Sequence, residues 1–97
     1  MPRYRLTLRA KGDILDIADF TIQRWDADQA GRYLQGLEHL LGELARQPRM
    51  GRARPELGER VLSFRCESHM IYYIAARPGI VVLRILHGRQ DPGRHLR

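Results

Sequence analysis

The stretch that decides the fold spans residues 61–87 and reads VLSFRCESHMIYYIAARPGIVVLRILH. It contains three runs rich in aliphatic, β-branched and aromatic residues, which favour β-strands. These runs are Val61–Cys66, His69–Ala75 and Ile80–His87. Glu67-Ser68 is short enough for a tight link, and Arg77-Pro78-Gly79 is a typical turn sequence. The pattern predicts three consecutive antiparallel strands.

A first amphipathic helix is predicted from Ala10 onward. Its apolar positions recur at helical spacing, and they are Ile14, Ile17, Ala18, Thr21 and Trp25. Three acidic residues fall mostly on the other side of this helix: Asp13, Asp16 and Asp19. Thr7 is placed to cap the helix, and Tyr4–Leu8 alternates in the manner of a short preceding strand.

A second helix is predicted to begin after Asp26, which can cap it in a variant of the capping box with Gln29. Its apolar stripe consists of Ala30, Leu34, Leu37, Leu41 and Leu44. The helix should end by Gln47, because Pro48 disfavours helical backbone at the residue before it. Two helices with almost no linker predict a helical hairpin. The Gly- and Pro-containing residues 48–60 are predicted to form a loop.

The order β-α-α-β-β-β predicts an α+β fold with an antiparallel sheet packed against an N-terminal helical hairpin. The 97 residues fit a single domain over 1–97. Both faces of the last strand are apolar, because one carries Val81, Leu83 and Ile85 and the other carries Ile80, Val82 and Leu86. The hairpin can cover only one face. The second face should be shielded by the C-terminal tail or by a partner.

The positive charge is concentrated in the second half of the chain. Residues 1–46 contain seven basic and seven acidic residues, so residues 47–97 carry the whole net charge of +6. Arginine supplies 16 of the 17 basic residues, and its guanidinium suits contacts with carboxylates and phosphates. The charge therefore indicates an acidic partner, either nucleic acid or protein, unless it forms only a solvated surface.

Several functional classes are excluded by what the sequence lacks. No run of about 18 apolar residues is present, and the N-terminus has no signal-peptide core. Cys66 is the only cysteine, so a reduced, cytoplasmic protein is expected. The four histidines show no zinc-binding spacing, and the glycines form no phosphate loop. No metal or cofactor is predicted.

A basic group is predicted where the strands end. It consists of Arg65, Arg84, His87, Arg89, Arg94 and His95. The two predicted turns place Arg65 and residues 84–89 at the same end of the sheet, so their charges should converge on one edge. Arginine beside histidine suits phosphodiester chemistry or the recognition of an acidic surface. The structural alternative is that Arg84 pairs with Glu67 or Asp91.

Residues 84–91, RILHGRQD, followed by Arg94-His95-Leu96, resemble the C-terminal motif of ParE-type toxins of the RelE/ParE superfamily. In that motif an aliphatic strand runs into Leu-His, a short polar pair, an Asp and a closing hydrophobe. Three other segments resemble the family in the same order, so the similarity covers nearly the whole chain. They are Tyr4-Arg5-Leu6 with Ala10, Asp13 and Ile14, then Thr21 with Trp25, and then residues 65–73. The chain departs from the family at Asp26, where Gly is common, and before Arg65, where paired arginines are frequent.

The resemblance implies the toxin of a type II toxin–antitoxin system, neutralised by a ParD-like antitoxin whose disordered tail folds over the helical hairpin. It implies inhibition of DNA gyrase in its cleaved-DNA state, no catalytic residues and no sequence-specific DNA binding. Toxicity would then be carried by Arg65, Arg84, His87, Arg89, Arg94, His95 and Leu96. A RelE-type ribosome-dependent mRNA endonuclease is the alternative, with His87 or His95 as acid/base. A non-toxic protein-binding module is the other.

Overall fold

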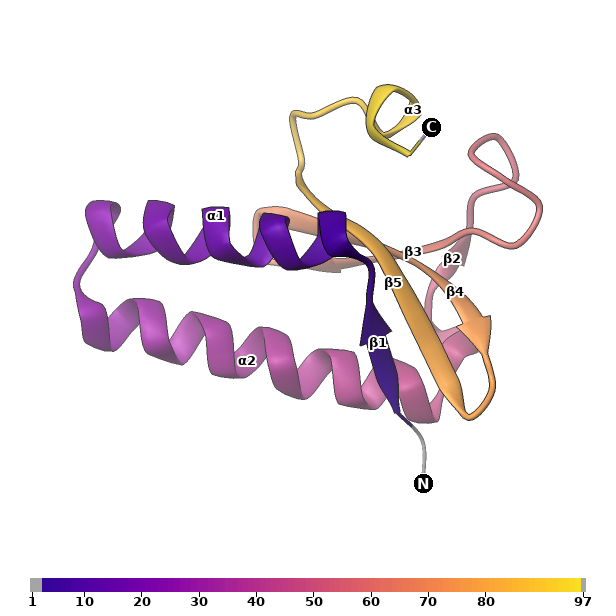
Figure 1. Cartoon of the computed structure of the whole chain (residues 1–97), viewed down its shortest axis with the longest axis horizontal. Helices are drawn as coiled ribbons and strands as arrows, with labels where there is room; N and C mark the ends of the chain where they lie inside the picture. Colours follow the sequence, from indigo (N-terminus) through magenta and orange to yellow (C-terminus); the bar gives the residue numbers. More distant parts are fainter. Residues whose placement is uncertain (1–2, 97) are drawn as a thin grey trace.

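The computed structural model describes residues 3–96 and has the predicted α+β architecture. Within these residues the elements follow the order β1 Tyr4–Leu6, α1 Leu8–Arg24, α2 Ala27–Arg46, the 3-10 helix η1 Pro48–Met50, β2 Arg52–Ala53, β3 Leu62–Cys66, β4 His69–Ala76, β5 Gly79–His87 and α3 Pro92–His95. Figure 1 shows α1 and α2 side by side and running in opposite directions, with β1 leading into α1.

Both helix N-termini are capped as the sequence predicts. The hydroxyl of Thr7 accepts from the backbone N–H of Ala10 at 3.0 Å, and the carboxylate of Asp26 accepts from that of Gln29 at 2.8 Å. Each cap satisfies an N–H that has no partner within its helix. Helix α1 begins at Leu8, two residues earlier than predicted, because the cap at Thr7 places the first turn there.

Two side chains of α1 lie differently from the prediction. Asp13 is buried rather than on the polar side, because it has a partner in β5, described below. Trp25 is 44% exposed. It is the C-cap of α1, with φ −121° and ψ −138°, so it has left the helical path that its spacing assumed. Its ring packs instead near Tyr33, with the centroids 6.2 Å apart.

The sheet has the strand order β1-β5-β4-β3-β2. The predicted antiparallel pairing of β3, β4 and β5 is confirmed, and β1 adds a parallel pairing to β5. Strand β2 lies in the segment predicted to be only loop and pairs with β3. The β4–β5 turn needs Gly79, because a Cβ there would collide with the carbonyl oxygen of Arg3.

The prediction of which β5 residues share a face is wrong beyond Val82. A β-bulge lies in the pairing of β4 with β5, where Tyr72 pairs with Arg84 but Tyr73 pairs with Val82. One extra residue, Leu83, interrupts the alternation, so the side that faces the helices changes from even to odd positions. Val82 and Ile85 therefore lie in the same core cluster.

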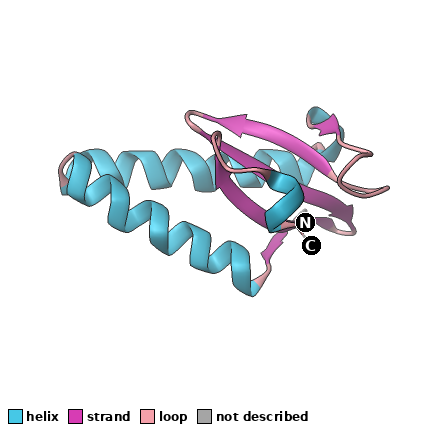
Figure 2. Cartoon of the chain, turned by 90° about the horizontal axis from the view of Figure 1, so that it is seen from above, coloured by secondary structure: helices cyan, strands magenta, loops and turns pink. Residues whose placement is uncertain are grey.

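The helical hairpin packs on one face of the sheet. This main core contains Ala10, Ile17, Leu37, Leu41, Leu44, Ala45, Ile71, Tyr73, Ile80, Val82 and Ile85. On the other face, Tyr72 and Leu86 form a smaller cluster to which Leu57 and Leu96 contribute. Figure 2 shows α3, which precedes Leu96, lying over the strands. The chain's own tail and the loop before β3 thus provide cover for the second face.

Candidate functional site

The predicted convergence of strand ends is correct for the backbone. His69, at the start of β4, pairs with Cys66 at the end of β3 and with His87 at the end of β5. The last residue of two strands and the first of a third therefore lie in one row. The C-terminal end of α1 and the first turns of α2 lie against this row, since Thr21 and Tyr33 line the same hollow as His87.

His69 and Tyr33 form a partly buried polar contact beside this row. The Tyr33 hydroxyl lies 3.1 Å from the carbonyl oxygen of Cys66 and donates to it. The same hydroxyl is 2.8 Å from Nδ1 of His69. Which of the two groups donates in this second contact depends on the tautomer of His69. Burial lowers the pKa of His69, and the neighbouring His87 lowers it further.

His87 lies edge-on to His69, with the ring centroids 5.6 Å apart. Its Nδ1 accepts from the backbone N–H of Arg89 at 3.2 Å, and its own backbone N–H donates to Oε1 of Gln90 at 2.7 Å. These bonds fold the chain into a turn directly after β5. The turn holds the exposed Arg89 side chain beside the histidine pair.

The two histidines line a hollow of about 380 Å³, which we call the strand-end hollow. Its walls are Phe20, Thr21, Arg24, Trp25, Tyr33, Ser68, His69, His87 and Arg89. Phe20 is half exposed, and the guanidinium of Arg24 lies over its ring at 5.6 Å from the centroid. Exposed aromatic rings with arginines are the groups that contribute most to binding at protein interfaces. The hollow is therefore suited to an acidic partner surface.

Arg84 is not part of this hollow, and its predicted pairing with Glu67 or Asp91 is wrong. Its guanidinium donates two hydrogen bonds of 2.8 Å to the two carboxylate oxygens of Asp13. The side chains are only 15% and 11% exposed. The bonds to Asp13 raise the pKa of Arg84. A third bond of 3.0 Å goes from Arg84 to the carbonyl oxygen of His95 and ties down the tail.

Asp13 also completes the edge of β5. Strand β1 pairs with β5 only as far as Val82. Beyond that point Thr7 donates its hydroxyl to the carbonyl of Leu83 at 2.8 Å, and Asp13 accepts from the N–H of Ile85 at 2.9 Å. The first turns of α1 thus satisfy backbone groups that an edge strand would leave unpaired. Arg84 and Asp13 together join α1, β5 and the tail.

The remaining predicted site residues lie elsewhere. Arg65 is exposed on β3 and donates to the carbonyl of its neighbour Glu67 at 3.0 Å. Arg94 is exposed on α3, and Leu96 packs into the cluster on the second face. Of the seven predicted residues, the structure places only His87 and Arg89 in the strand-end hollow. Arg84 and His87 also line a neighbouring hollow together with His69. The predicted convergence of side chains thus extends to Arg84, whereas Arg65, Arg94 and Leu96 line neither hollow, because side chains of paired strands alternate between faces.

Most residues that line the strand-end hollow were not predicted from the sequence as site residues. His69 and Tyr33 contribute its partly buried polar contact, and Phe20, Arg24 and Trp25 contribute its exposed rim. The sequence held one signal for them, because Trp25 and His69 both lie in segments that resemble ParE-type toxins. Phe20 and Arg24 gave no such signal, since an exposed aromatic residue on a helix does not indicate what it lines.

Neither a metal-binding group nor a membrane-spanning helix is present in the described part of the chain. Residues 3–96 contain no group of three or more His, Cys, Asp or Glu side chains arranged to hold a metal ion. No helix among them is long and apolar enough to cross a membrane.

Similarity to known proteins extends over almost the whole chain. A family model described as the ParE toxin of the type II toxin–antitoxin system parDE matches residues 4–92. The chain is 37% identical over 95 residues to Toxin ParE1 of Mycobacterium tuberculosis, covering 97% of each protein. It is 34% identical over 99 residues to Toxin ParE1 of Caulobacter vibrioides, covering 99% of each.

A solved structure has the same fold. A chain described as belonging to the chromosomal ParDE TA system from P. aeruginosa superposes with a TM-score of 0.74, covering 90% of this chain and 96% of that one. At 20% identity this likeness concerns the fold alone. The family match and the two relatives go further, because they extend over nearly every residue described above. The chain therefore belongs to the ParE toxin family of type II toxin–antitoxin systems.

Proposed function

We propose that this protein inhibits DNA gyrase by holding the enzyme in its cleaved-DNA state, and that the strand-end hollow is the surface that contacts gyrase. Family membership supports the role as a toxin. The observation that carries the choice of surface is the grouping of Arg24, Arg89 and His87 with exposed aromatic rings. Such a surface recognises carboxylates through its arginines and packs against apolar groups through its rings. Gyrase as target also implies a cytoplasmic location.

The placement of the histidines favours this function over mRNA cleavage. A nuclease would need an acid and a base on either side of a phosphodiester. The nuclease alternative would use His87 or His95 for that role, but the ring of His87 lies against His69 and its Nδ1 already accepts from the backbone N–H of Arg89. The ring of His69 is held by Tyr33, and its lowered pKa keeps it uncharged at neutral pH.

The gyrase proposal predicts a direct effect on the purified enzyme. Gyrase incubated with this protein, ATP and relaxed plasmid should lose supercoiling activity and accumulate linear DNA after protein denaturation. Translation in a cell-free system should continue at its normal rate. Active gyrase together with arrested translation and cut messages would instead identify an mRNA endonuclease. If both systems are unaffected and expression of the lone protein is harmless, the chain is a binding module and the toxin proposal fails for this protein.

We further propose that a ParD-like antitoxin binds the outer face of α1. Three large apolar side chains lie on this helix at intervals of seven residues, which places them on one side. They are Leu8, Leu15 and Ile22, exposed by 84%, 67% and 52%. Isolated exposed hydrophobic residues are ordinary on a protein surface. A row of them along one side of a helix, spaced about two turns apart, is instead suited to pack against the apolar face of a second, amphipathic helix. Acidic residues in the antitoxin would complement the net charge of +6.

Replacing Leu15 by glutamate should abolish neutralisation while leaving toxicity intact. Leu15 is exposed, so the substitution removes a contact for the antitoxin without disturbing the core. Co-expression with a cognate ParD-like antitoxin should rescue growth for the original protein and fail to rescue the variant. Gln23→Glu, which makes the same change of charge on the same helix, serves as the control and should be rescued. Equal rescue of both variants would place the antitoxin elsewhere.

A further inference from the structure

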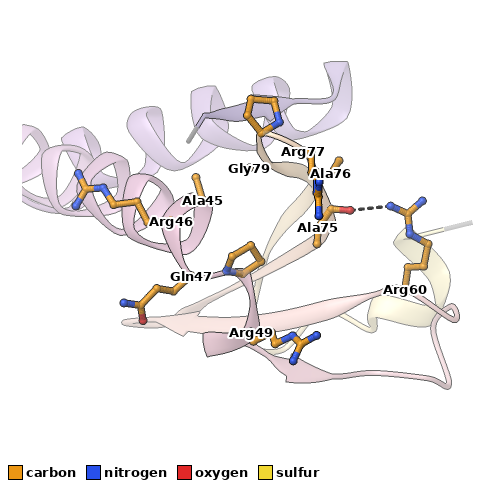
Figure 3. A pocket seen from close by; sticks show the side chains of 11 residues that line it. Ala45, Arg46, Gln47, Arg49, Arg60, Ala75, Ala76, Arg77 and Gly79 are labelled. Atoms are coloured by element: carbon orange, nitrogen blue, oxygen red, sulfur yellow. Dashed lines mark hydrogen bonds between the residues drawn. The ribbon is translucent and has the colours of Figure 1, made fainter. Parts of the chain in front are cut away.

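A second hollow lies at the opposite end of the sheet from the strand-end hollow. It is a groove of about 940 Å³ between the end of α2, η1, the end of the loop before β3 and the β4–β5 turn. Four arginines line it: Arg46, Arg49, Arg60 and Arg77. Figure 3 shows these side chains coming from separate elements around the groove. We call this feature the arginine groove.

The positive charge of the arginine groove is not balanced within the fold. Its lining contains no Asp or Glu. The ion pairs among residues 3–96 are His39–Glu43, Arg54–Glu56 and Arg84–Asp13, and none of them includes a groove arginine. All four arginines are exposed. Four positive charges around one groove without an acidic neighbour make the local potential positive, which attracts an anionic ligand.

One of the four guanidinium groups is held in place. Nη2 of Arg60 donates to the carbonyl oxygen of Ala75 at 2.7 Å, a bond drawn in Figure 3. This bond uses one of the five N–H donors of the guanidinium and leaves the others available. Because the side chain is already ordered, less conformational entropy is lost when an anion binds.

The rest of the lining indicates which kind of anion fits. Apart from Gln47, it consists of small or rigid residues: Ala45, Pro48, Ala75, Ala76, Pro78 and Gly79. It contains no aromatic ring on which an unpaired base could stack, so single-stranded nucleic acid is disfavoured. It also has no large aliphatic or aromatic anchor of the kind that dominates binding to a peptide. A groove with several arginines but no aromatic or large aliphatic side chain is suited to bind a row of phosphate groups.

We propose that the arginine groove binds the phosphate backbone of duplex DNA without reading its sequence. Contacts to phosphate position a protein on DNA but carry no sequence information. The inference goes beyond the proposed inhibition of gyrase, because it concerns binding of DNA by this chain alone. It adds a second contact surface at the end of the molecule away from His87 and Arg89.

The test compares two double variants that each lower the net charge by two. Arg49→Ala with Arg77→Ala alters the groove, and Lys11→Ala with Arg32→Ala alters exposed positions on α1 and α2. Binding of a fluorescent duplex of about 20 base pairs is followed by anisotropy over a range of KCl concentrations. We expect the groove variant to bind at least about tenfold more weakly at low salt. Its plot of log K against log salt should be shallower by about 1.8, the value for two lost phosphate contacts.

The control variant should keep the original salt dependence, and melting curves by circular dichroism should show that both variants are folded. Equal loss of binding in the two variants would overturn the proposal, because it would reflect net charge alone. An unchanged groove variant would also overturn it. If a Glu-rich peptide binds the groove more tightly than the duplex, the site takes an acidic peptide instead. No gyrase is present, so the outcome is independent of the gyrase assay.

Discussion

Replacing Arg84 by alanine should lower the free energy of unfolding by about 3–5 kcal/mol, because it leaves a buried carboxylate without its counter-charge. The side chain of Asp13 is only 11% exposed and takes two hydrogen bonds from Arg84. The bond from Arg84 to the carbonyl of His95 would be lost as well. For a domain of about this size, such a loss corresponds to a fall in Tm of at least about 12 °C.

Urea denaturation and thermal melting of the purified variant would measure this effect. Arg94→Ala is a suitable control, because Arg94 is exposed on α3 and its removal should change stability by no more than about 0.5 kcal/mol. Toxicity of the Arg84 variant should decline together with its stability. If stability is kept while toxicity is lost, Arg84 contacts the target directly and its pairing with Asp13 is not structurally important.

Replacing His87 and Arg89 together by alanine should abolish toxicity while leaving the fold and antitoxin binding nearly unchanged. Both residues line the strand-end hollow. Arg89 is exposed and His87 is half-buried at the end of β5, so little core packing is lost. A central arginine of an interface contributes on the order of 2 kcal/mol, which corresponds to roughly a 30-fold weaker complex. Colony formation on inducing medium and direct binding to purified gyrase would measure the two effects.

Arg5→Ala provides a matched control, since Arg5 is exposed on β1 and lies outside the hollow. It should remain toxic. The conservative variant His87→Asn should retain more activity than His87→Ala, because its amide oxygen can accept the backbone N–H of Arg89 in place of Nδ1. Full toxicity of the double variant would remove the strand-end hollow from the proposed function and leave the remaining predicted residues, Arg65 and the tail, to be tested.

The sequence by itself determined the elements whose causes are local. Thr7 and Asp26 cap the two helices through residues three positions away, and Pro48 ends the second helix at the residue before it, as predicted. The strands at residues 61–87 follow from β-branched and aromatic runs bounded by turn residues. These interactions join residues that lie only a few positions apart in the sequence, so the spacing of residue types is enough to predict them. The same reasoning placed the three strand ends together, because short links leave antiparallel strands little choice of register.

Only the tertiary structure decided what the side chains do at those strand ends. Arg84 pairs with Asp13 across 71 positions of sequence, and no local pattern distinguishes that carboxylate from the solvated acids on α1. The bulge at Leu83 changes which side of β5 faces the helices, because one extra residue reverses the alternation of a strand. Arg46, Arg49, Arg60 and Arg77 line one groove because the end of α2, η1, the loop before β3 and the β4–β5 turn meet there. The packing of the helices on the sheet brings these segments together. That packing is determined by the buried core residues and not by the arginines at the surface.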